Sequence, residues 1–243
     1  MILAIDAGNS RIKWRITNDG QQIAQGAQLT AKFLEGEALN LSEIQSVSEI
    51  RIASVAGDEV VDSLKRQLLS QFSAPIHFAM VSAPMGELCC AYEDPETLGI
   101  DRWLAIAAAY NKYSQPIMVV DAGSAITIDI IGPGGQHVGG YILPGLSLMH
   151  DALWKNTSDV RVVGSGTEEL WIPGKNTQQA VNKGCLLAAA SAIESLAAQF
   201  PVRIVLTGGD AKIISQVISL EADNHSNLVL DGLVLDGVGL QGI

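Results

Sequence analysis

The chain has few of the residues that mark secreted, membrane-spanning or nucleic-acid-binding proteins. Only 3 of its 243 residues are cysteine, and aromatic residues make up 5% of it. Neighbouring Cys89 and Cys90 are poor partners for a disulfide, and no cysteine or histidine spacing fits a zinc site. We therefore expect inert thiols in a reducing compartment, which predicts a cytoplasmic protein.

Positive charge is also scarce. Lys and Arg number 15 against 26 Asp and Glu, so the formal net charge is −11 at pH 7. Nonspecific binding of nucleic acid needs clustered Lys and Arg, and we predict no nucleic-acid partner. An anionic small molecule stays open as a ligand, because backbone N–H groups and a metal ion can hold phosphates.

Long apolar runs and a Walker motif are missing. No run reaches the roughly 18 apolar residues of a membrane span, and we predict no membrane association. Residues 1–6 lack a basic region and reach a carboxylate early, so we expect a strand there rather than a signal peptide. The absence of a Walker motif argues against a P-loop nucleoside triphosphatase.

What the chain does contain is a repeat that halves it. Residues 5–13 and 120–128 each end an apolar β run in Asp-Ala-Gly and continue through small polar residues into a second β run. Asp6 and Asp121 are 115 positions apart. We predict two related α/β domains, residues 1–115 and 116–243, each opening with a β-hairpin.

Helical patterns lie between these β runs. Segments 61–72 and 104–113 are amphipathic or alanine-rich, and segment 178–200 is a long helix or a pair of helices. A strand over 202–206 and a helix over 211–220 follow. Chains of this kind bind ligands in the cleft between their halves, at the C-terminal ends of strands.

Each Asp-x-Gly loop has groups that suit a phosphate site. Gly8 and Gly123 permit positive φ, so each turn can be tight and its backbone N–H groups can converge on one point. Lys13 can add a positive charge over a phosphate, although a solvated lysine on an edge strand is the ordinary alternative. Asp6 and Asp121 can hold a cation or its waters. One such loop is usually a plain hairpin turn, but two copies half a chain apart favour a clamp for a triphosphate.

Residues 92–103 hold a candidate catalytic group. Gly99 breaks the segment before the predicted helix, so Asp101 and Arg102 fall at a helix start. Asp101 can simply cap that helix, whose N-terminus favours a carboxylate. It can instead accept the proton of an attacking hydroxyl, with Arg102 holding an anionic substrate. The residues alone leave both interpretations open.

Several motifs resemble those of a known family. The two loops, Asp6-x-Gly8-Asn9-Ser10-x-x-Lys13 and Asp121-x-Gly123-Ser124-x-x-Thr127, resemble the phosphate motifs of the acetate kinase, sugar kinase, Hsp70 and actin superfamily, most of all those of type III pantothenate kinases. The run Leu98-Gly99-x-Asp101-Arg102-Trp103 is similar to that family's pantothenate signature. Further matching blocks, in the family's order, are residues 139–145, 174–184 and 207–211.

The resemblance implies a fold and an activity. The fold is two actin- or ribonuclease-H-like domains, each a mixed five-stranded-type sheet with flanking helices, with the active site in the interdomain cleft. The activity is ATP-dependent phosphorylation of pantothenate to 4'-phosphopantothenate, the first step of coenzyme A biosynthesis. Mg²⁺ and a monovalent cation, potassium or ammonium, would take part. A homodimer is also implied, in which Thr177 of one subunit completes the site of the other.

The family's residue roles carry over to the matching positions. Asp101 becomes the general base, and Asp121 becomes the ligand of the monovalent cation. The implied contacts to pantothenate are Tyr92, Gly99, Ile100, Asp101, Arg102 and Thr177. The implied contacts to ATP are Asp6, Ala7, Gly8, Asn9, Ser10, Arg11, Ile12, Lys13, Ser124, Gly208 and Gly209.

Three positions depart from the family pattern. Ser10 and Ser124 stand where Thr is usual and keep the hydroxyl. Asp94 stands where Asn is usual and adds negative charge near the site of an anionic substrate.

Three other functions stay open on the same fold. They are a catalytically idle regulatory relative similar to the Bvg accessory factor, a nucleotide-switched interaction module, and a sugar kinase. The presence of Asp6, Asp101, Arg102 and Asp121 favours an enzyme.

Overall fold

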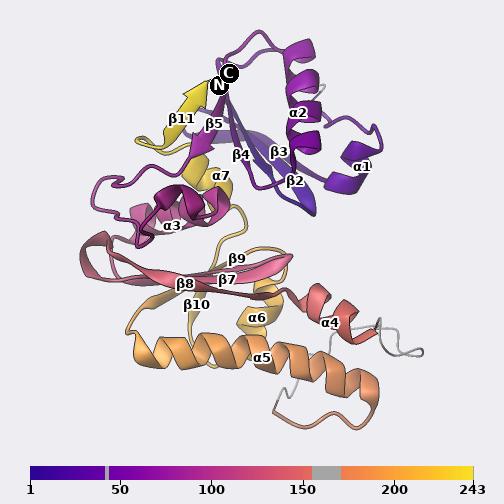
Figure 1. Ribbon diagram of the computed structural model, residues 1–243, viewed down its shortest axis with the longest axis vertical. Coiled ribbons are helices and arrows are strands. Elements are labelled where there is room, and N and C mark those ends of the chain that lie inside the picture. The colour runs from indigo at the N-terminus through magenta and orange to yellow at the C-terminus, as the bar shows by residue number, and fades with distance from the viewer. Residues whose placement is uncertain (42–43, 155–170, 243) are drawn as a thin grey trace. The chain divides into compact units, whose positions relative to one another are not determined.

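The computed structural model describes residues 1–41, 44–154 and 171–242, which form two compact units (Figure 1). The first unit is Met1–Ala108 with Leu228–Ile243, and the second is Ala109–Asn227. The division therefore falls within helix α3, Ile100–Tyr113. The domain boundary between residues 115 and 116 stays a prediction. No helix within the described ranges is both long and apolar enough to cross a membrane.

The first unit is built on a mixed sheet of six strands in the order β11-β5-β4-β1-β2-β3. Its elements are β1 (Ile2–Ala7), β2 (Arg11–Asn18), β3 (Gln21–Leu29), α1 (Thr30–Leu34), β4 (Glu49–Ser54), α2 (Asp58–Gln71), β5 (Ile76–Met80), the 3₁₀ turn η1 (Pro95–Thr97), the start of α3, α7 (Leu228–Leu233) and β11 (Gly239–Gly242).

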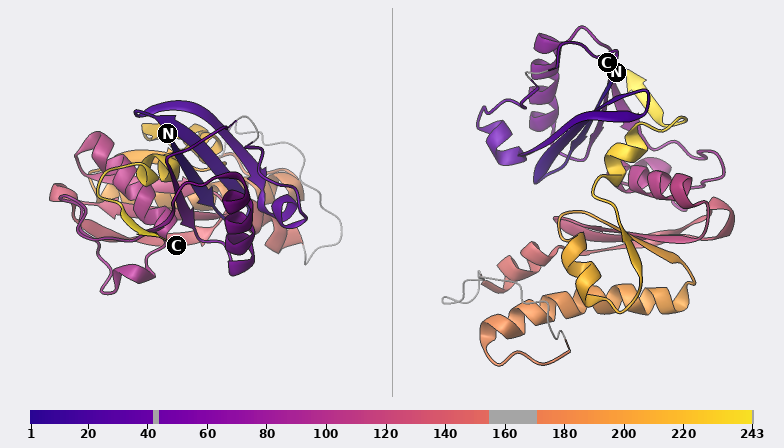
Figure 2. Two further views of the ribbon diagram at one scale, coloured as in Figure 1. Left: turned by 90° about the horizontal axis from the view of Figure 1, so that it is seen from above. Right: turned by 180° about the vertical axis from the view of Figure 1, so that it is seen from behind.

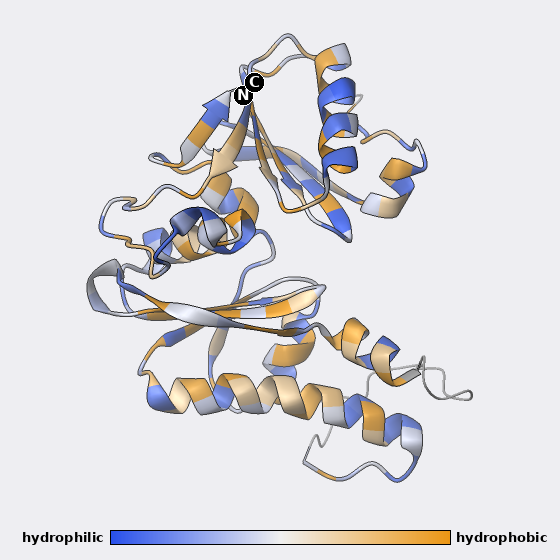
Figure 3. Ribbon diagram, viewed as in Figure 1, coloured by the Kyte–Doolittle hydropathy of each residue, from blue (hydrophilic) through white to orange (hydrophobic). Residues whose placement is uncertain are grey.

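Strand β1 is central in this sheet and pairs parallel with β4 and antiparallel with β2. Its run of apolar residues does not alternate, because both faces of the strand are covered. Leu3 and Ile5 join one core with Leu64 and Leu68 of α2. The buried residues of α2, Val60, Leu64 and Leu68, recur every four positions, so this helix has an apolar and a polar side, as Figure 3 shows.

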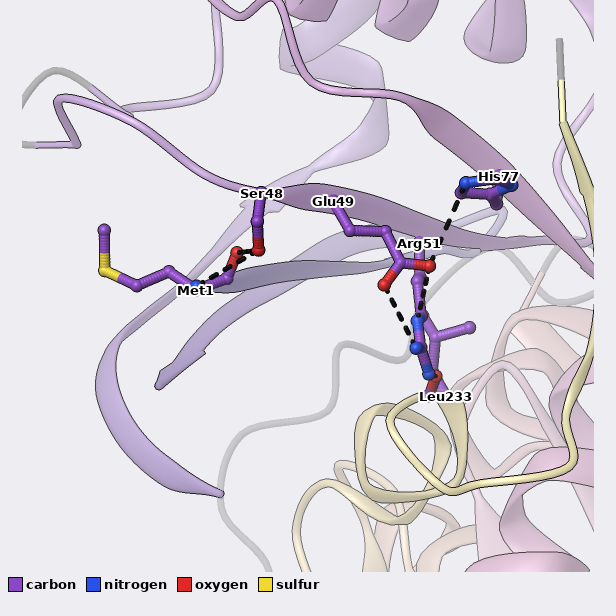
Figure 4. Close-up of polar contacts among 6 residues, drawn as sticks. All are labelled: Met1, Ser48, Glu49, Arg51, His77 and Leu233. Carbon is purple, nitrogen blue, oxygen red and sulfur yellow. Dashed lines mark hydrogen bonds and ion pairs between the residues drawn. The ribbon is translucent and has the colours of Figure 1, made fainter. Parts of the chain in front are cut away.

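Helix α7 packs against β1 and β4 and is tied to the sheet by polar contacts. The Arg51 guanidinium donates to both carboxylate oxygens of Glu49, at 3.0 and 3.1 Å, and to the carbonyl of Leu233 at 3.3 Å (Figure 4). Arg15 on β2 forms an ion pair with Asp231 at 2.5 Å. The chain thus returns after residue 227 to complete the unit that its first hundred residues began.

The second unit repeats this design with five strands in the order β10-β9-β6-β7-β8. Its elements are the end of α3, β6 (Ile117–Ala122), β7 (Ala125–Ile131), the 3₁₀ turn η2 (Pro133–Gly135), β8 (His137–Pro144), α4 (Leu146–Trp154), α5 (Thr177–Gln199), β9 (Arg203–Thr207), α6 (Ala211–Val217) and β10 (Ala222–Asn224). Within this unit α5 and α6 lie on one side of the sheet (Figure 2).

The predicted repeat is confirmed strand by strand. Strands β6, β7 and β8 form an antiparallel meander as β1, β2 and β3 do, and β9 pairs parallel with β6 as β4 does with β1. The first sheet adds β11, which pairs antiparallel with β5. The predicted two-part α/β fold is therefore correct, and α5 is one helix of 23 residues.

Candidate functional site

The first loop joins β1 to β2 and brings most of the predicted ATP contacts to one hairpin. Asp6 is directly opposite Lys13 in the antiparallel register, so both side chains lie on the same face of the sheet. The N–H of Gly8 donates to the carbonyl of Arg11 at 3.0 Å and closes the turn. Asn9, Ser10 and Arg11 are exposed at the tip of the hairpin, whereas Ala7 and Ile12 are buried beneath it.

The second loop has the same construction. Asp121 stands opposite Thr127 between β6 and β7, and the N–H of Gly123 donates to the carbonyl of Ala125 at 2.9 Å. Asp6 and Asp121 are each the last but one residue of their strand. In each strand the residues on both sides of the aspartate face the core of the unit. Because successive side chains of a strand point to opposite faces, each aspartate lies on the other face of its sheet.

Positive φ, which glycine permits, is not used at Gly8 or Gly123: neither has φ in the left-handed region. At Gly8 the constraint is space, since an added Cβ would lie 3.1 Å from the carbonyl oxygen of Arg11. At Gly123 an added Cβ would lie 3.6 Å from Asp121 Oδ1, which is ordinary contact.

Two blocks from distant parts of the second unit pack onto the second loop. Gly208, with φ +92°, lies so close that an added Cβ would be 2.5 Å from Asp121 Oδ1 and 2.3 Å from the carbonyl oxygen of Ala122. The N–H of Gly145 donates to the carbonyl of Ser124 at 3.1 Å. The structure therefore brings the segments 139–145 and 207–211 against the second loop, with Gly208 beside the carboxylate of Asp121.

Asp210 continues this group after Gly209. Its N–H donates to the carbonyl of Ala122 at 2.9 Å, which fastens the turn after β9 to the second loop. Burial raises the pKa of the Asp210 carboxyl, and the charge of His150 acts in the opposite direction.

Asp101 and Arg102 lie in the first turn of α3, at Ile100–Tyr113. Asp101 Oδ1 accepts the backbone N–H of Arg102 at 2.8 Å, so the carboxylate does satisfy one free amide of the helix start. Arg102 is buried and donates to the hydroxyl of Tyr92 at 3.0 Å, with its guanidinium 5.7 Å from the centre of that ring. Gly99 leaves room for the carboxylate, because an added Cβ would lie 2.7 Å from Asp101 Oδ1.

A cavity of about 380 Å³ opens beside this turn, within the first unit. Gly99 and Ile100, two of the predicted substrate contacts, line it. Ser54 and Met80, the last residues of β4 and β5, also line it. These two were missed from the sequence, although the C-terminal ends of parallel strands are common places for ligands.

Thr177 is the first residue of α5 and belongs to the second unit, whereas the cavity described above lies in the first. The side chain of Asn176 caps this helix by accepting the N–H of Gln179 at 2.8 Å. Thr177 borders a groove of about 640 Å³ between α4 and α5, whose other lining residues include Leu148, Leu153 and Val181. Leu148 and Leu153 are about half exposed, so the groove presents an apolar surface.

Among the described residues, no group of three or more His, Cys, Asp or Glu side chains converges to hold a metal ion. Mg²⁺ in kinases is usually held by one or two carboxylates together with phosphates. Asp6 and Asp121 are the carboxylates placed at the two loops.

The comparisons with known proteins agree with each other. The model of the type III pantothenate kinase family matches residues 2–199. A type III pantothenate kinase of Acinetobacter baumannii (strain ACICU) is 38% identical over 235 residues, which cover 95% of each chain. One from Teredinibacter turnerae is 35% identical over 244 residues, covering 97% of this chain and 98% of its own.

Solved structures share the fold. A Campylobacter jejuni protein described as a Baf family transcriptional activator superposes with a TM-score of 0.62 at 24% identity, over 95% of this chain and 94% of that one. A Sinorhizobium meliloti protein described as a 2-dehydro-3-deoxygalactonokinase superposes with a TM-score of 0.57 at 12% identity, over 96% of this chain and 97% of that one.

Proposed function

This chain belongs to the type III pantothenate kinase family, and we propose that it transfers the γ-phosphoryl group of ATP to the primary hydroxyl of pantothenate. The products would be ADP and 4'-phosphopantothenate, an intermediate of coenzyme A biosynthesis. Family membership supports the reaction and the use of ATP. The observation that carries the residue assignment is the first turn of α3, where Asp101 accepts the N–H of Arg102 and the Arg102 guanidinium donates to Tyr92. The cavity beside this turn is lined by Gly99 and Ile100.

Asp101 is the proposed general base. The hydroxyl oxygen of pantothenate attacks the γ-phosphorus, its proton passes to the Asp101 carboxylate, and the bond to the β-phosphate oxygen breaks to release ADP. The helix contact uses Asp101 Oδ1. A carboxylate accepts several hydrogen bonds, so this contact and proton transfer are compatible.

Arg102 and Tyr92 are the proposed contacts to the substrate carboxylate, and Gly99 and Ile100 line the neighbouring wall. A buried guanidinium binds a carboxylate strongly, because little water competes for it. The hydrogen bond from Arg102 to the Tyr92 hydroxyl holds the guanidinium in one orientation before substrate arrives. The cavity of about 380 Å³ has the size of a site for a small metabolite.

The two Asp-x-Gly loops are the proposed contacts to the triphosphate. In the first loop the exposed Asn9 and Ser10, with Lys13 behind them, supply donors and a positive charge. In the second loop Ser124 supplies a hydroxyl, while Gly208 and Gly209 would lie along the adenosine. Mg²⁺ would neutralise phosphate charge, and Asp121 would hold a potassium or ammonium ion.

Asp101→Asn tests the base. The variant keeps the size of the side chain and an oxygen that can accept the N–H of Arg102, so a role limited to capping predicts near-normal turnover. Loss of a general base predicts a fall in kcat of about 10²- to 10⁴-fold. The measurement is ADP release at saturating ATP and pantothenate, with the melting temperature recorded for both proteins.

Asp94→Asn is the matched control for the same loss of charge. Asp94 caps the η1 turn by accepting the N–H of Glu96 at 3.2 Å, and Asn can accept that bond as well. We expect turnover close to that of the unaltered protein. Equal losses in the two variants would remove Asp101 as base, and the same assay in potassium, ammonium and sodium tests the monovalent cation.

The rival functions give different results in this assay. A sugar kinase releases ADP with a sugar and not with pantothenate, and an idle relative or an interaction module releases none with either. The similarity to the Campylobacter jejuni protein shows the fold alone and favours none of these alternatives.

A further inference from the structure

Thr30 lies beneath the first loop, although no motif in the sequence pointed to it. It is the first residue of α1, directly after β3, and only 4% of it is exposed. Figure 1 shows β3 running into α1 at this point. Leu29, the residue before it, pairs with Arg11 at the start of β2, so the register of the hairpin brings Thr30 to the loop.

Thr30 makes two hydrogen bonds to the loop, both to backbone carbonyls. Its hydroxyl donates to the carbonyl of Gly8 at 2.8 Å, and its N–H donates to the carbonyl of Ser10 at 3.1 Å. The carbonyl of Arg11 accepts the N–H of Gly8 at 3.0 Å. The carbonyl oxygens of Gly8, Ser10 and Arg11 are thus all bonded within the unit.

The hydrogen bond to the Gly8 carbonyl sets the direction of the N–H group that follows it, that of Asn9. In a planar trans peptide the C=O and the following N–H point in opposite directions. Because the Gly8 carbonyl is held against the Thr30 hydroxyl, the N–H of Asn9 points away from α1. An anion-binding loop needs its N–H groups outward and its carbonyls turned away, because carbonyl oxygens repel phosphate.

We propose that Thr30 is a positioning residue for ATP: its hydroxyl orients the Gly8–Asn9 peptide so that the Asn9 N–H is directed to a phosphate. The inference deepens the proposed function, on which it rests, by assigning the first loop a buried support. Thr30 itself touches neither the nucleotide nor the reacting atoms in this scheme.

Thr30→Val tests the inference, because valine keeps the shape and the backbone N–H but lacks the hydroxyl. Binding of a non-hydrolysable ATP analogue with Mg²⁺, measured by calorimetry without pantothenate, should weaken by about five- to tenfold. The KM for ATP should rise in the same proportion, with the KM for pantothenate changed by less than about twofold. Thr30→Ser restores the hydroxyl and should restore binding.

Thr17→Val is the matched control. Thr17 is a buried threonine of the same hairpin, at its far end opposite Ile2. Loss of the Thr17 hydroxyl should leave analogue binding unchanged. The inference fails if Thr30→Val binds the analogue normally, if Thr30→Ser is as weak as Thr30→Val, or if Thr17→Val is equally weak. Should Thr30→Val not fold, Thr30→Cys, a much weaker donor of similar size, takes its place.

The two proposals fail separately. If the unaltered protein does not phosphorylate pantothenate but Thr30→Val still weakens analogue binding, the reaction is wrong and the role of Thr30 stands. If the unaltered protein phosphorylates pantothenate and Thr30→Val binds the analogue normally, the proposed reaction stands and the role of Thr30 is wrong.

Discussion

Gly208 and Gly209 are neighbours in the turn after β9, but they differ in the space around them. Gly208 has φ +92°, and the space that a side chain would need is filled by the backbone of Ala122 and the carboxylate of Asp121. An added Cβ at Gly209 meets nothing within 4 Å, and its φ is outside the left-handed region. Within the unit, Gly208 is therefore a position that requires glycine, whereas Gly209 has space for a side chain.

We predict that Gly208→Ala lowers the free energy of unfolding by about 2 kcal/mol or more, because it combines a strained φ with contact to backbone that cannot move freely. Gly209→Ala should change the free energy of unfolding by less than about 1 kcal/mol. Denaturation in urea compares the two variants. Similar stability of both would show that the close approach to Asp121 is not a constraint.

At the scale of elements, β10 is a short edge strand that pairs parallel with β9. Three residues of pairing give little stability, and side chains add to it. Asp223 on β10 accepts a hydrogen bond from Arg203 on β9, and the guanidinium of Arg203 stacks 4.8 Å from the centre of the Tyr113 ring. The pKa of Asp223 is lowered, chiefly by the hydrogen bond from Arg203.

The sign of the pH effect follows from this shift. A carboxyl whose pKa is lower in the folded state stabilises the protein above its unfolded pKa, and that contribution is lost as the pH falls through the folded pKa. We predict that Arg203→Gln raises the pKa of Asp223 towards its ordinary value. An NMR titration of the Asp223 carboxyl carbon measures this, and an unchanged midpoint would mean that another group holds the pKa down.

At the scale of the whole molecule, we propose from the family resemblance a homodimer that shares its active sites. Thr177 borders an apolar groove on the second unit, and a surface of half-exposed leucines favours association with another chain. In this dimer, each active site would combine Asp101 of one subunit with Thr177 of the other.

Mixing two defective proteins tests that arrangement. Asp101→Asn and Thr177→Ala should each be impaired alone, but a mixed dimer has one site with both residues intact. Random exchange of subunits should therefore restore up to about a quarter of the unaltered activity. Activity that stays at the sum of the separate proteins after exchange would place both residues in one chain.

The two-part α/β fold, its internal repeat and the family were all predictable from the sequence alone. Strand and helix periodicity is local, and the repeated Asp-Ala-Gly motif is visible at Asp6 and Asp121 because each copy ends a strand in the same way. Asp101 at a helix start was likewise readable from the order of neighbouring residues.

Contacts between groups far apart in the chain were visible only once the chain was folded. It showed that Gly208 packs on Asp121, that Thr30 supports the first loop and that the last strand joins the first sheet. It also showed that Gly8 and Gly123 need no positive φ. Such facts depend on strand register and on packing between elements far apart in the chain, and local sequence patterns carry no information about them.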